Sequence, residues 1–372
     1  MDDEKEGASL LSIPLNPDGL LECGRHQRPG ACFGRRVGPR GERRLRLSVQ
    51  VPIVEELLPI FGSPQVNKGS FAVLTAEGES IIGAVPTLQS KTQRTLFFGH
   101  MKTVLIAEEL AAAGLKSIID ALRRHPGIPP QAHVLLVKDE AAAMLSHALW
   151  HKGIPGISLV TFFHAQGKRD QAFDQPVWRL VRNISLPTQD AFLPILEYDT
   201  DEETFIIEGL GVLHDDRLVG ELSGEEARMF GLLSGNTRSA YLNLPISEYG
   251  WVAMRQVRAK TKIGYKKTRT GPVIIIDVKA HGCLIESTKM AVRLNREDRQ
   301  RIDHAVSTHL EREMRKTLQK LQGLGADLLA LGEVYRVHNA STWEPSAWER
   351  IYPEIPIEVK VEFTVDNYGI LR

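Results

Sequence analysis

The stretch RTLFFGHMKTVLIAEELAAAGL, from Arg94 to Leu115, decides how the first part of this chain is interpreted. It contains two runs of β-branched and aromatic residues, Thr95 to Phe98 and Thr103 to Ile106, with Gly99 between them. Such runs predict strands, and a glycine gives the backbone the freedom to turn. The stretch therefore predicts a hairpin or a bulged strand pair.

The same stretch contains one candidate for chemistry, His100, at the expected turn. Catalysis requires a second group within hydrogen-bond reach, and the neighbouring residues offer none. We therefore interpret His100 as a turn histidine bonded to the backbone. Beyond it, Glu108 and Glu109 favour the start of a short helix, and Gly114 favours its end.

Strands and helices alternate on both sides of this stretch, which predicts an N-terminal mixed α/β domain over residues 45–190. An internal Pro86 interrupts one predicted helix, and Asp139 is a candidate N-cap of another. The expected strands are Leu45 to Val51, Ser70 to Thr75 and His133 to Lys138, and the expected helices are Ile81 to Lys91, Lys116 to Arg124 and Asp139 to Ala148.

A small middle domain is expected over residues 191–250, after the break at Pro187. Three strands are predicted there, Phe192 to Tyr198, Thr204 to Leu213 and Arg217 to Glu221. Ser223 and Glu226 then have the spacing of a capping box, which predicts a helix to about Leu233.

The C-terminal domain, residues 251–372, is predicted to hold three strands and one long helix, residues 296–322. Asn295 and Asp298 favour the helix start, and apolar residues recur along one face of it. These residues are Ile302, Val306, Leu310, Met314, Leu318 and Leu321, and the strands are Ala253 to Tyr265, Val273 to Ile285 and Ile357 to Val365. The predicted fold class is α+β, with three mixed α/β domains, the last an antiparallel sheet packed with a long helix.

Composition is ordinary for a globular protein, with 46 basic and 46 acidic residues among 372. This balance gives no support to a nucleic-acid partner. No apolar run is long enough to span a bilayer, and the N-terminus lacks the features of a secretory signal, so the chain as written is predicted to be soluble. Its cysteines, Cys23, Cys32 and Cys283, form neither a disulfide framework nor a zinc pattern, and Cys283 is expected as a small apolar strand residue.

Other candidate motifs are incomplete. His147 and His151 have the spacing of two ligands on one helix, but a third ligand is missing, and Gly209 and Gly211 lack the third glycine of a dinucleotide site. The basic residues Arg255, Arg258, Lys260, Lys262, Lys266, Lys267 and Arg269 alternate with apolar ones, as on the solvent face of a strand. Trp343 and Trp348 are expected at a core edge. We predict no catalytic, cofactor-binding or metal-binding residues.

Four segments resemble the Ger(x)C family, the C subunits of the nutrient germinant receptors of spore-forming bacteria. They are RTLFFGHMKTVLIAEELAAAGL at Arg94 to Leu115, the preceding Glu77 to Ser90, GLGVLHDDRLVGELSGEEARMFGLLSG at Gly209 to Gly235, and ADLLALGEVYRVHNASTWEPSAWERIYPEIPIEVKVEFTVDNYG at Ala326 to Gly369. The resemblance extends from about Leu45 to Arg372.

The resemblance implies a non-catalytic lipoprotein subunit on the outer face of the spore inner membrane. It also implies two membrane-embedded partners, the A and B subunits, a three-domain α+β fold, and no cofactor. Two alternatives stay open: an extracytoplasmic module that itself binds a small ligand, and a hydrolase-type enzyme that uses His100. An enclosed pocket with convergent polar groups would favour the ligand-binding module.

The N-terminus departs from the family, which has a lipoprotein signal ending in Gly-Cys-Trp and then a strand. Residues 1–44 instead contain an arginine-rich block and are expected to be disordered. Codons allowed for Pro17 to Gly38, read one base late, can spell Leu-Thr-Gly-Cys-Trp followed by an apolar strand, which suggests a frameshift. The lipid-bearing cysteine would then be missing from this chain. The nucleotide sequence tests this hypothesis.

Overall fold

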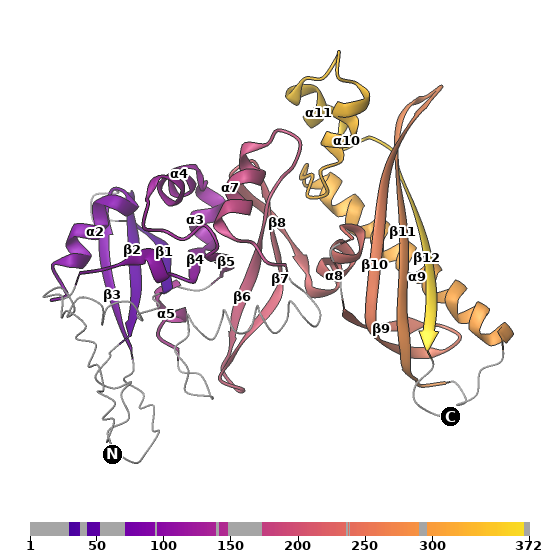
Figure 1. The fold of residues 1–372 in the computed structure, drawn as a ribbon, viewed down its shortest axis with the longest axis horizontal. Coiled ribbons are helices and arrows are strands. Elements are labelled where there is room, and N and C mark those ends of the chain that lie inside the picture. The colour runs from indigo at the N-terminus through magenta and orange to yellow at the C-terminus, as the bar shows by residue number, and fades with distance from the viewer. Residues whose placement is uncertain are drawn as a thin grey trace, which may run out of the picture.

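The computed structural model describes residues 30–37, 43–52, 71–93, 95–138, 141–147, 173–235, 237, 239–289 and 296–367. In these ranges the strands form two sheets, one of eight strands and one of four. Figure 1 shows the two sheets following one another along the long axis of the molecule, with helices packed against both. The mixed α+β class predicted from the sequence is confirmed.

The first sheet is parallel at its centre and antiparallel towards both edges. The two central strands consist almost wholly of buried apolar residues, because helices cover both faces of a parallel sheet. In spatial order its strands are β3 (Phe71–Gly78), β2 (Arg43–Pro52), β1 (Gly30–Val37), β4 (Thr103–Ala107), β5 (His133–Val137), β6 (Phe192–Asp199), β7 (Thr204–His214) and β8 (Arg217–Ser223).

Two apolar cores lie on the two faces of this sheet. On one face the helices bury residues such as Leu88, Ile118 and Leu180 against the strands. On the other face Met144 packs against Leu105 and neighbouring strand residues. The helices of the first face are α2 (Ile81–Gln89), α3 (Glu108–Ala113), α4 (Lys116–Arg124) and α7 (Val177–Ser185), and the helix of the second is α5 (Ala141–Met144).

The hairpin predicted within Arg94 to Leu115 is wrong. Residues 95–97 have no regular structure, and Phe98–His100 forms the 3-10 turn η3. Only β4 is a strand, and it pairs in parallel with β1 and β5, both distant in sequence. The two edges of β4 are thus occupied by distant strands, which leaves no place for a local partner.

The second sheet contains β12 (Ile357–Asn367), β11 (Gly271–Ser287), β10 (Gly250–Thr268) and β9 (Ala240–Ile246), in that order. β10 pairs antiparallel with β11, as predicted, and also with β9, which was not among the predicted strands, whereas β12 runs parallel to β11. Parallel pairing needs a crossover connection between the two strands. After β11 the chain passes through helices and enters β12 at the end of the sheet where β11 begins.

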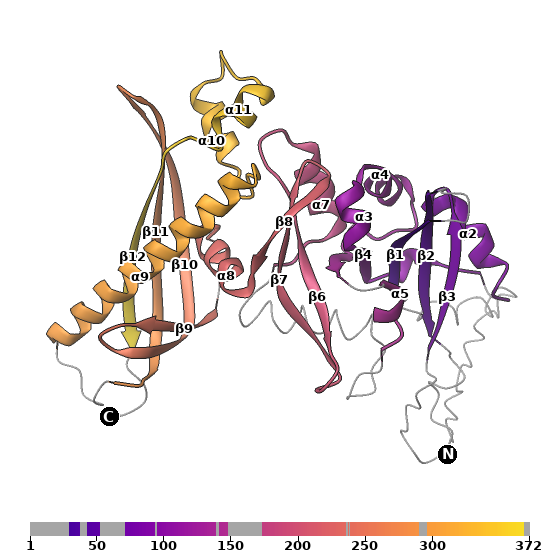
Figure 2. The ribbon, with the colours of Figure 1, turned by 180° about the vertical axis from the view of Figure 1, so that it is seen from behind.

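The long helix predicted from the apolar stripe is confirmed as α9 (Arg296–Gly323), and it packs across the second sheet (Figure 2). Every member of the stripe is at most 2% exposed. The helix also covers the free edge of β12: Ser307 Oγ accepts a hydrogen bond from the backbone N–H of Phe363, and Asp303 Oδ1 accepts one from Val365 N–H, both at 2.9 Å. These two N–H groups are therefore not available to pair with another chain at this part of the edge.

Between the sheets lies an apolar joint built around α8 (Gly224–Leu233), which starts at the predicted capping box. Phe173, Phe192 and Phe230 contact one another there and pack with residues after the end of α9. Strands β6 to β8, expected in a separate middle domain, extend the first sheet. The division into three domains stays a prediction. The remaining helices are α10 (Leu331–His338) and α11 (Pro345–Ile351).

Residues 1–44 were predicted to be disordered, but residues 30–37 form the strand β1, which lies between β2 and β4. Backbone hydrogen bonds from both neighbours hold this strand, and such bonds form whatever the side chains are. Residues 1–29, with Cys23 and the first two arginines of the arginine-rich block, lie outside the described residues.

Candidate functional site at the joint between the sheets

Asp190, in the loop before β6, connects the two halves of the molecule. One of its carboxylate oxygens accepts a hydrogen bond from Asp215 N–H at 3.0 Å, and the other accepts one from Asp327 N–H at 2.8 Å. Its own N–H donates to the carbonyl of Asp327 at 2.9 Å. The loop before β6 and the loop after α9, far apart in sequence, are thus bonded in both directions.

His214, at the end of β7, completes this contact. Its Nδ1 lies 3.3 Å from Asp190 Oδ2, and the side chains of His214 and Asp190 are 34% and 14% exposed. The hydrogen bond with Asp190 raises the pKa of His214, since the charged imidazolium gains a carboxylate partner. The joint therefore favours an imidazolium–carboxylate pair.

Asp327 is fully buried, and its carboxyl group holds the first turn of α10. Oδ1 accepts from Leu331 N–H at 2.9 Å and Oδ2 from Gly332 N–H at 2.7 Å. The residue at the N-cap position, Ala330, has a left-handed backbone with φ of 57° and no side chain able to cap. Asp327, three residues before Ala330, caps the helix in its place. Its carboxyl group bonds two N–H groups that would otherwise lack partners.

Asp216, in the turn between β7 and β8, accepts the backbone N–H bonds at the start of α4. Its Oδ2 accepts from Lys116 N–H at 2.9 Å, and its carbonyl accepts from Leu115 N–H at 2.8 Å. Gly114 has a φ of 114°, and a Cβ there would lie 2.9 Å from Asp216 Oδ2. A glycine is therefore required for both the backbone angle and the close approach.

The three aspartates, Asp190, Asp216 and Asp327, link α4, the β7–β8 turn and α10 in one chain of hydrogen bonds. Leu115, His214 to Asp216, and Asp327 come from three of the four segments that carry the family resemblance, so the joint brings those segments together. The carboxylate oxygens that take part accept N–H bonds and hold backbone in place. These hydrogen bonds connect the structural elements to one another.

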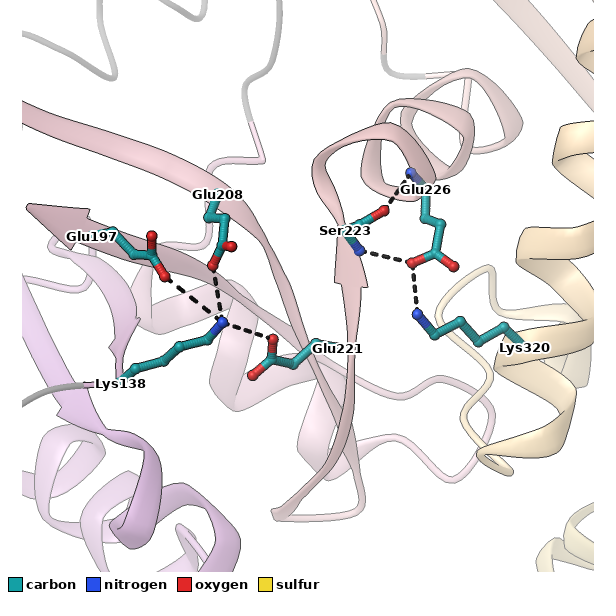
Figure 3. A network of polar contacts seen from close by, with 7 residues as sticks. All are labelled: Lys138, Glu197, Glu208, Glu221, Ser223, Glu226 and Lys320. Atoms are coloured by element: carbon teal, nitrogen blue, oxygen red, sulfur yellow. Dashed lines mark hydrogen bonds and ion pairs between the residues drawn. The ribbon is translucent and has the colours of Figure 1, made fainter. Parts of the chain in front are cut away.

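Two further polar clusters tie neighbouring elements together (Figure 3). Lys138, just after β5, places its Nζ 2.9 Å from Glu208, 3.1 Å from Glu221 and 3.7 Å from Glu197, which lie on β7, β8 and β6. The hydrogen bond with Glu208 raises the pKa of Lys138. A hydrogen bond between Glu208 and Glu197 raises the pKa of Glu197 and lowers that of Glu208.

The second cluster joins α8 to α9. Ser223 and Glu226 form the predicted capping box, and Lys320 Nζ lies 2.6 Å from Glu226 Oε2. Glu226 thus serves both the start of α8 and the last turn of α9 (Figure 3). Opposite charge within reach of a partly buried carboxylate favours its charged form, and the pKa of Glu226 is lowered against the effect of its burial.

The structure separates the residues that the sequence singled out. The half-buried ring of His100 meets Phe97 edge-on, and among the described residues no acid or nucleophile lies within hydrogen-bond distance of it. His147 follows the end of α5 and stacks on Tyr198 at 3.9 Å, and His151 lies outside the described residues. The helix predicted to carry both histidines ends at Met144, because the turn at residues 145–146 breaks it.

The other predictions fare better. Cys283 lies in β11 with a free thiol, and the basic residues follow the exposed side of β10 to the turn at Thr268 to Gly271. Trp348 is 4% exposed and belongs to the core of the second sheet, with Trp343 packed beside it. No helix in the described ranges is long and apolar enough to cross a membrane.

Two family profiles match the chain in order. "Spore germination protein N-terminal domain" matches residues 39–198, and "Spore germination B3/GerAC like, C-terminal" matches residues 208–369. The chain belongs to the Ger(x)C family of spore germination proteins. The two matches together include all three aspartates of the joint, and the family resemblance seen in the sequence is confirmed.

This Ger(x)C protein is similar to two proteins of Bacillus subtilis (strain 168). It is 22% identical to the putative spore germination protein YfkR over 342 residues, which is 88% of this chain and 87% of the relative. It is 25% identical to spore germination protein KC over 336 residues, 80% and 79% of the two chains. Its fold is similar to the crystal structure of the GerBC protein, with a TM-score of 0.60 and 18% identity over 91% of this chain and 97% of that one.

Family membership makes the Ger(x)C protein a non-catalytic subunit of a germinant receptor. The sequence missed the aspartate joint, although its members were visible: the His214-Asp215-Asp216 turn and the aspartate after Gly325-Ala326. The joint depends on a contact between segments distant in sequence, since Asp190 and Asp327 are separated by more than a hundred residues. Spacing along the chain cannot show that two loops meet.

Proposed function

We propose that this Ger(x)C protein is the peripheral subunit of a nutrient germinant receptor, held at the outer face of the spore inner membrane. It works there beside two membrane-embedded subunits, A and B, and helps to convert nutrient binding into germination. The observation that supports this most is the match of both family halves, in order, over residues 39–198 and 208–369.

The shape of the protein fits such a role. Two sheets are joined by an apolar core and by paired hydrogen bonds, so that a force or contact at one sheet is passed to the other through α8, α9 and the aspartate joint. Buried, fully bonded polar groups make a stiff connection. A stiff, elongated scaffold can hold membrane subunits in a fixed relation to one another.

Co-purification tests the assembly. An affinity-tagged copy expressed in spores of its own host should carry multi-spanning membrane proteins encoded next to it through detergent extraction. Recovery of the tagged protein alone, at normal expression, would contradict the proposed complex. Sequencing the locus shows whether such neighbouring genes exist.

The histidine alternative has its own test. His100→Ala should leave receptor assembly and germination intact, since His100 has a packing contact with Phe97 and no described catalytic partner. Loss of germination at normal receptor level would instead make His100 a functional residue. His125→Ala is a suitable control, because its ring packs in the same edge-on way on Phe98.

A small-ligand role is the second candidate, and the feature that bears on it is a groove of about 950 Å³ between α4, α7 and the β7–β8 turn, which is open to solvent and not an enclosed pocket. The groove is lined by the apolar side chains of Ile119, Val181 and Ile184 and by the charged Lys116 and Asp215. Calorimetric titration of the full chain with candidate nutrients tests it. Saturable heat that disappears in Ile184→Arg would favour this candidate over a purely structural subunit.

A further inference from the structure

The second sheet has one covered face and one open face. α9 buries Val252, Met254 and Leu242 on the covered face. Figures 1 and 2 show the helix on one side of β10 to β12, with no element of the described chain across the other side. Because side chains alternate along a strand, the residues between the buried ones point outwards.

Three large apolar side chains gather on this open face near the β9–β10 turn. They are Tyr241 on β9, Trp251 on β10 and Ile285 on β11, with exposed fractions of 54%, 51% and 50%. The strand register places them around the small Ala253, which pairs with Asn243 on one side and Glu286 on the other. We call these three residues the aromatic patch. Isolated exposed apolar residues are common, but three that share one side of adjacent strands indicate a contact surface.

Four cations continue from the patch along β10: Arg255, Arg258, Lys260 and Lys262, which we call the cationic row. The last three are exposed and occupy alternate positions, so they project from the same face about 7 Å apart. Within the described part of the chain none of the four forms an ion pair. By contrast, Lys279 on β11 is paired with Glu362 of β12 at 2.9 Å.

Charge is therefore divided across the open face. The cations of β10, beside the short edge strand β9, form no ion pair within the described residues, although Asp277 lies opposite Lys262 and Glu286 opposite Ala253 on β11. β12, at the other edge, carries Glu358, Glu362 and Asp366 among its exposed residues, with one lysine, Lys360. An anionic surface would attract the β9–β10 edge and repel the β12 edge. The division sets an orientation as well as an attraction.

We propose that the β9–β10 edge of this open face rests on an anionic lipid surface, with the aromatic patch in the headgroup region and the cationic row against phosphates. The amphipathic rings of tryptophan and tyrosine are enriched at this depth of a bilayer, and basic residues beside them bind anionic headgroups. The face is a flat sheet surface, whereas protein partners are usually anchored in pockets. A lipid surface needs no such pocket.

The proposed lipid contact rests on the proposed placement at the inner membrane, but vesicle binding can be measured without the receptor. The full chain is mixed with vesicles of phosphatidylcholine alone or with phosphatidylglycerol added, and the bound fraction is measured by flotation. We expect binding to the vesicles that contain phosphatidylglycerol, weakened by salt because headgroup attraction is screened. Equal binding to both vesicles without a salt effect, or no binding to either, would overturn the proposal.

Matched variants locate the contact. Trp251→Ser with Ile285→Ser should weaken binding by at least about tenfold, and so should Lys260→Glu with Lys262→Glu, since each buried apolar group and each cation contributes separately. Trp178→Ser removes a tryptophan of similar exposure, 45%, from α7 and should change nothing. Lys360→Glu alters a lysine on the same face but at the acidic edge and should also have little effect.

Two results would assign the patch to another occupant. If the wild-type chain sediments as a dimer that the patch variant splits, the patch is an interface between copies. If the aromatic-patch variant and the cationic-row variant both bind vesicles as well as the wild type but fail to co-purify with the membrane subunits, this face binds protein. Thermal unfolding of each variant excludes loss of the fold as the cause, and failure of vesicle binding would leave the proposed receptor role standing.

Discussion

Asp327 shows how burial changes the meaning of a carboxyl group in this protein. Burial, aided by the nearby negative charge of Asp190, raises its pKa from 3.8 to about 7, against two backbone N–H bonds that favour the charged form. Between these values the folded protein retains a proton that the unfolded chain has released. Folding is therefore weakened as the pH rises through this range.

A pH titration of stability tests this residue. We expect the free energy of unfolding to fall by about 2 kcal/mol more between about pH 5.5 and pH 8 in the wild type than in Asp327→Asn. The pKa of His214 is also raised, so its contribution is likewise lost as the pH rises and remains in both proteins. Chemical denaturation at several pH values measures the difference. Parallel pH profiles would show that Asp327 is already ionised in the folded protein.

Gly209 is the residue where a single added methyl group should do most damage. A Cβ there would lie 2.1 Å from the carbonyl oxygen of Leu222 on β8. We expect Gly209→Ala to separate β7 from β8 locally and to lower the free energy of unfolding by about 2 kcal/mol or more. Gly264→Ala is the control, because the nearest atom to its Cβ would be at 3.9 Å. Equal melting temperatures for the two variants would show that β8 moves freely.

At the level of elements, the edge of β12 depends on two side chains of α9. Replacing Asp303 and Ser307 by alanine leaves the N–H groups of Val365 and Phe363 without partners, which costs about 1–3 kcal/mol for each buried group. Hydrogen exchange of β12 should become faster, while exchange in β5 of the first sheet stays unchanged. Unchanged protection of β12 would mean that water or neighbouring strands replace these bonds.

β1, GACFGRRV, has few large apolar residues, although it lies inside the first sheet between β2 and β4. Under the frameshift hypothesis, codons allowed for Gly30–Val37 can spell Ala-Leu-Val-Ser-Gly-Val-Gly-Leu. The apolar crevice that Ala31 lines with Leu47 and Phe98 has a volume of only about 10 Å³. We expect Ala31→Leu to lower the free energy of unfolding by about 1–3 kcal/mol, because the larger side chain has no room without displacing its neighbours. A higher melting temperature would indicate that the sequence of the shifted frame is the one that fits.

The sequence predicted those elements whose cause is local. The apolar stripe of α9 and the capping box of α8 are set by residues within a few positions of one another, and both were found where predicted. Thr95 to Ile106 was misjudged because β4 pairs with strands far away in sequence. The aspartate joint was not predicted for the same reason, since Asp190 and Asp327 become neighbours only when both sheets are in place.

At the scale of the whole molecule, the two sheets behave as one unit only if the joint holds. We expect Asp190→Ala to remove the bonds to Asp215 and Asp327 and to loosen the angle between the sheets, leaving each sheet folded. Small-angle X-ray scattering should then show a broader distribution of molecular length, with little change in circular dichroism. A scattering profile identical to that of the wild type would assign the rigidity to the apolar core around Phe230.

The central claim is that this chain is a non-catalytic subunit required for the response of spores to nutrients. Its most direct test is the germination of spores that lack the gene, followed as loss of optical density after nutrients are added. The account predicts that the response to at least one nutrient is lost, with spore formation unchanged, and that a copy carrying His100→Ala restores it. An unchanged response to every nutrient that wild-type spores recognise would contradict the account.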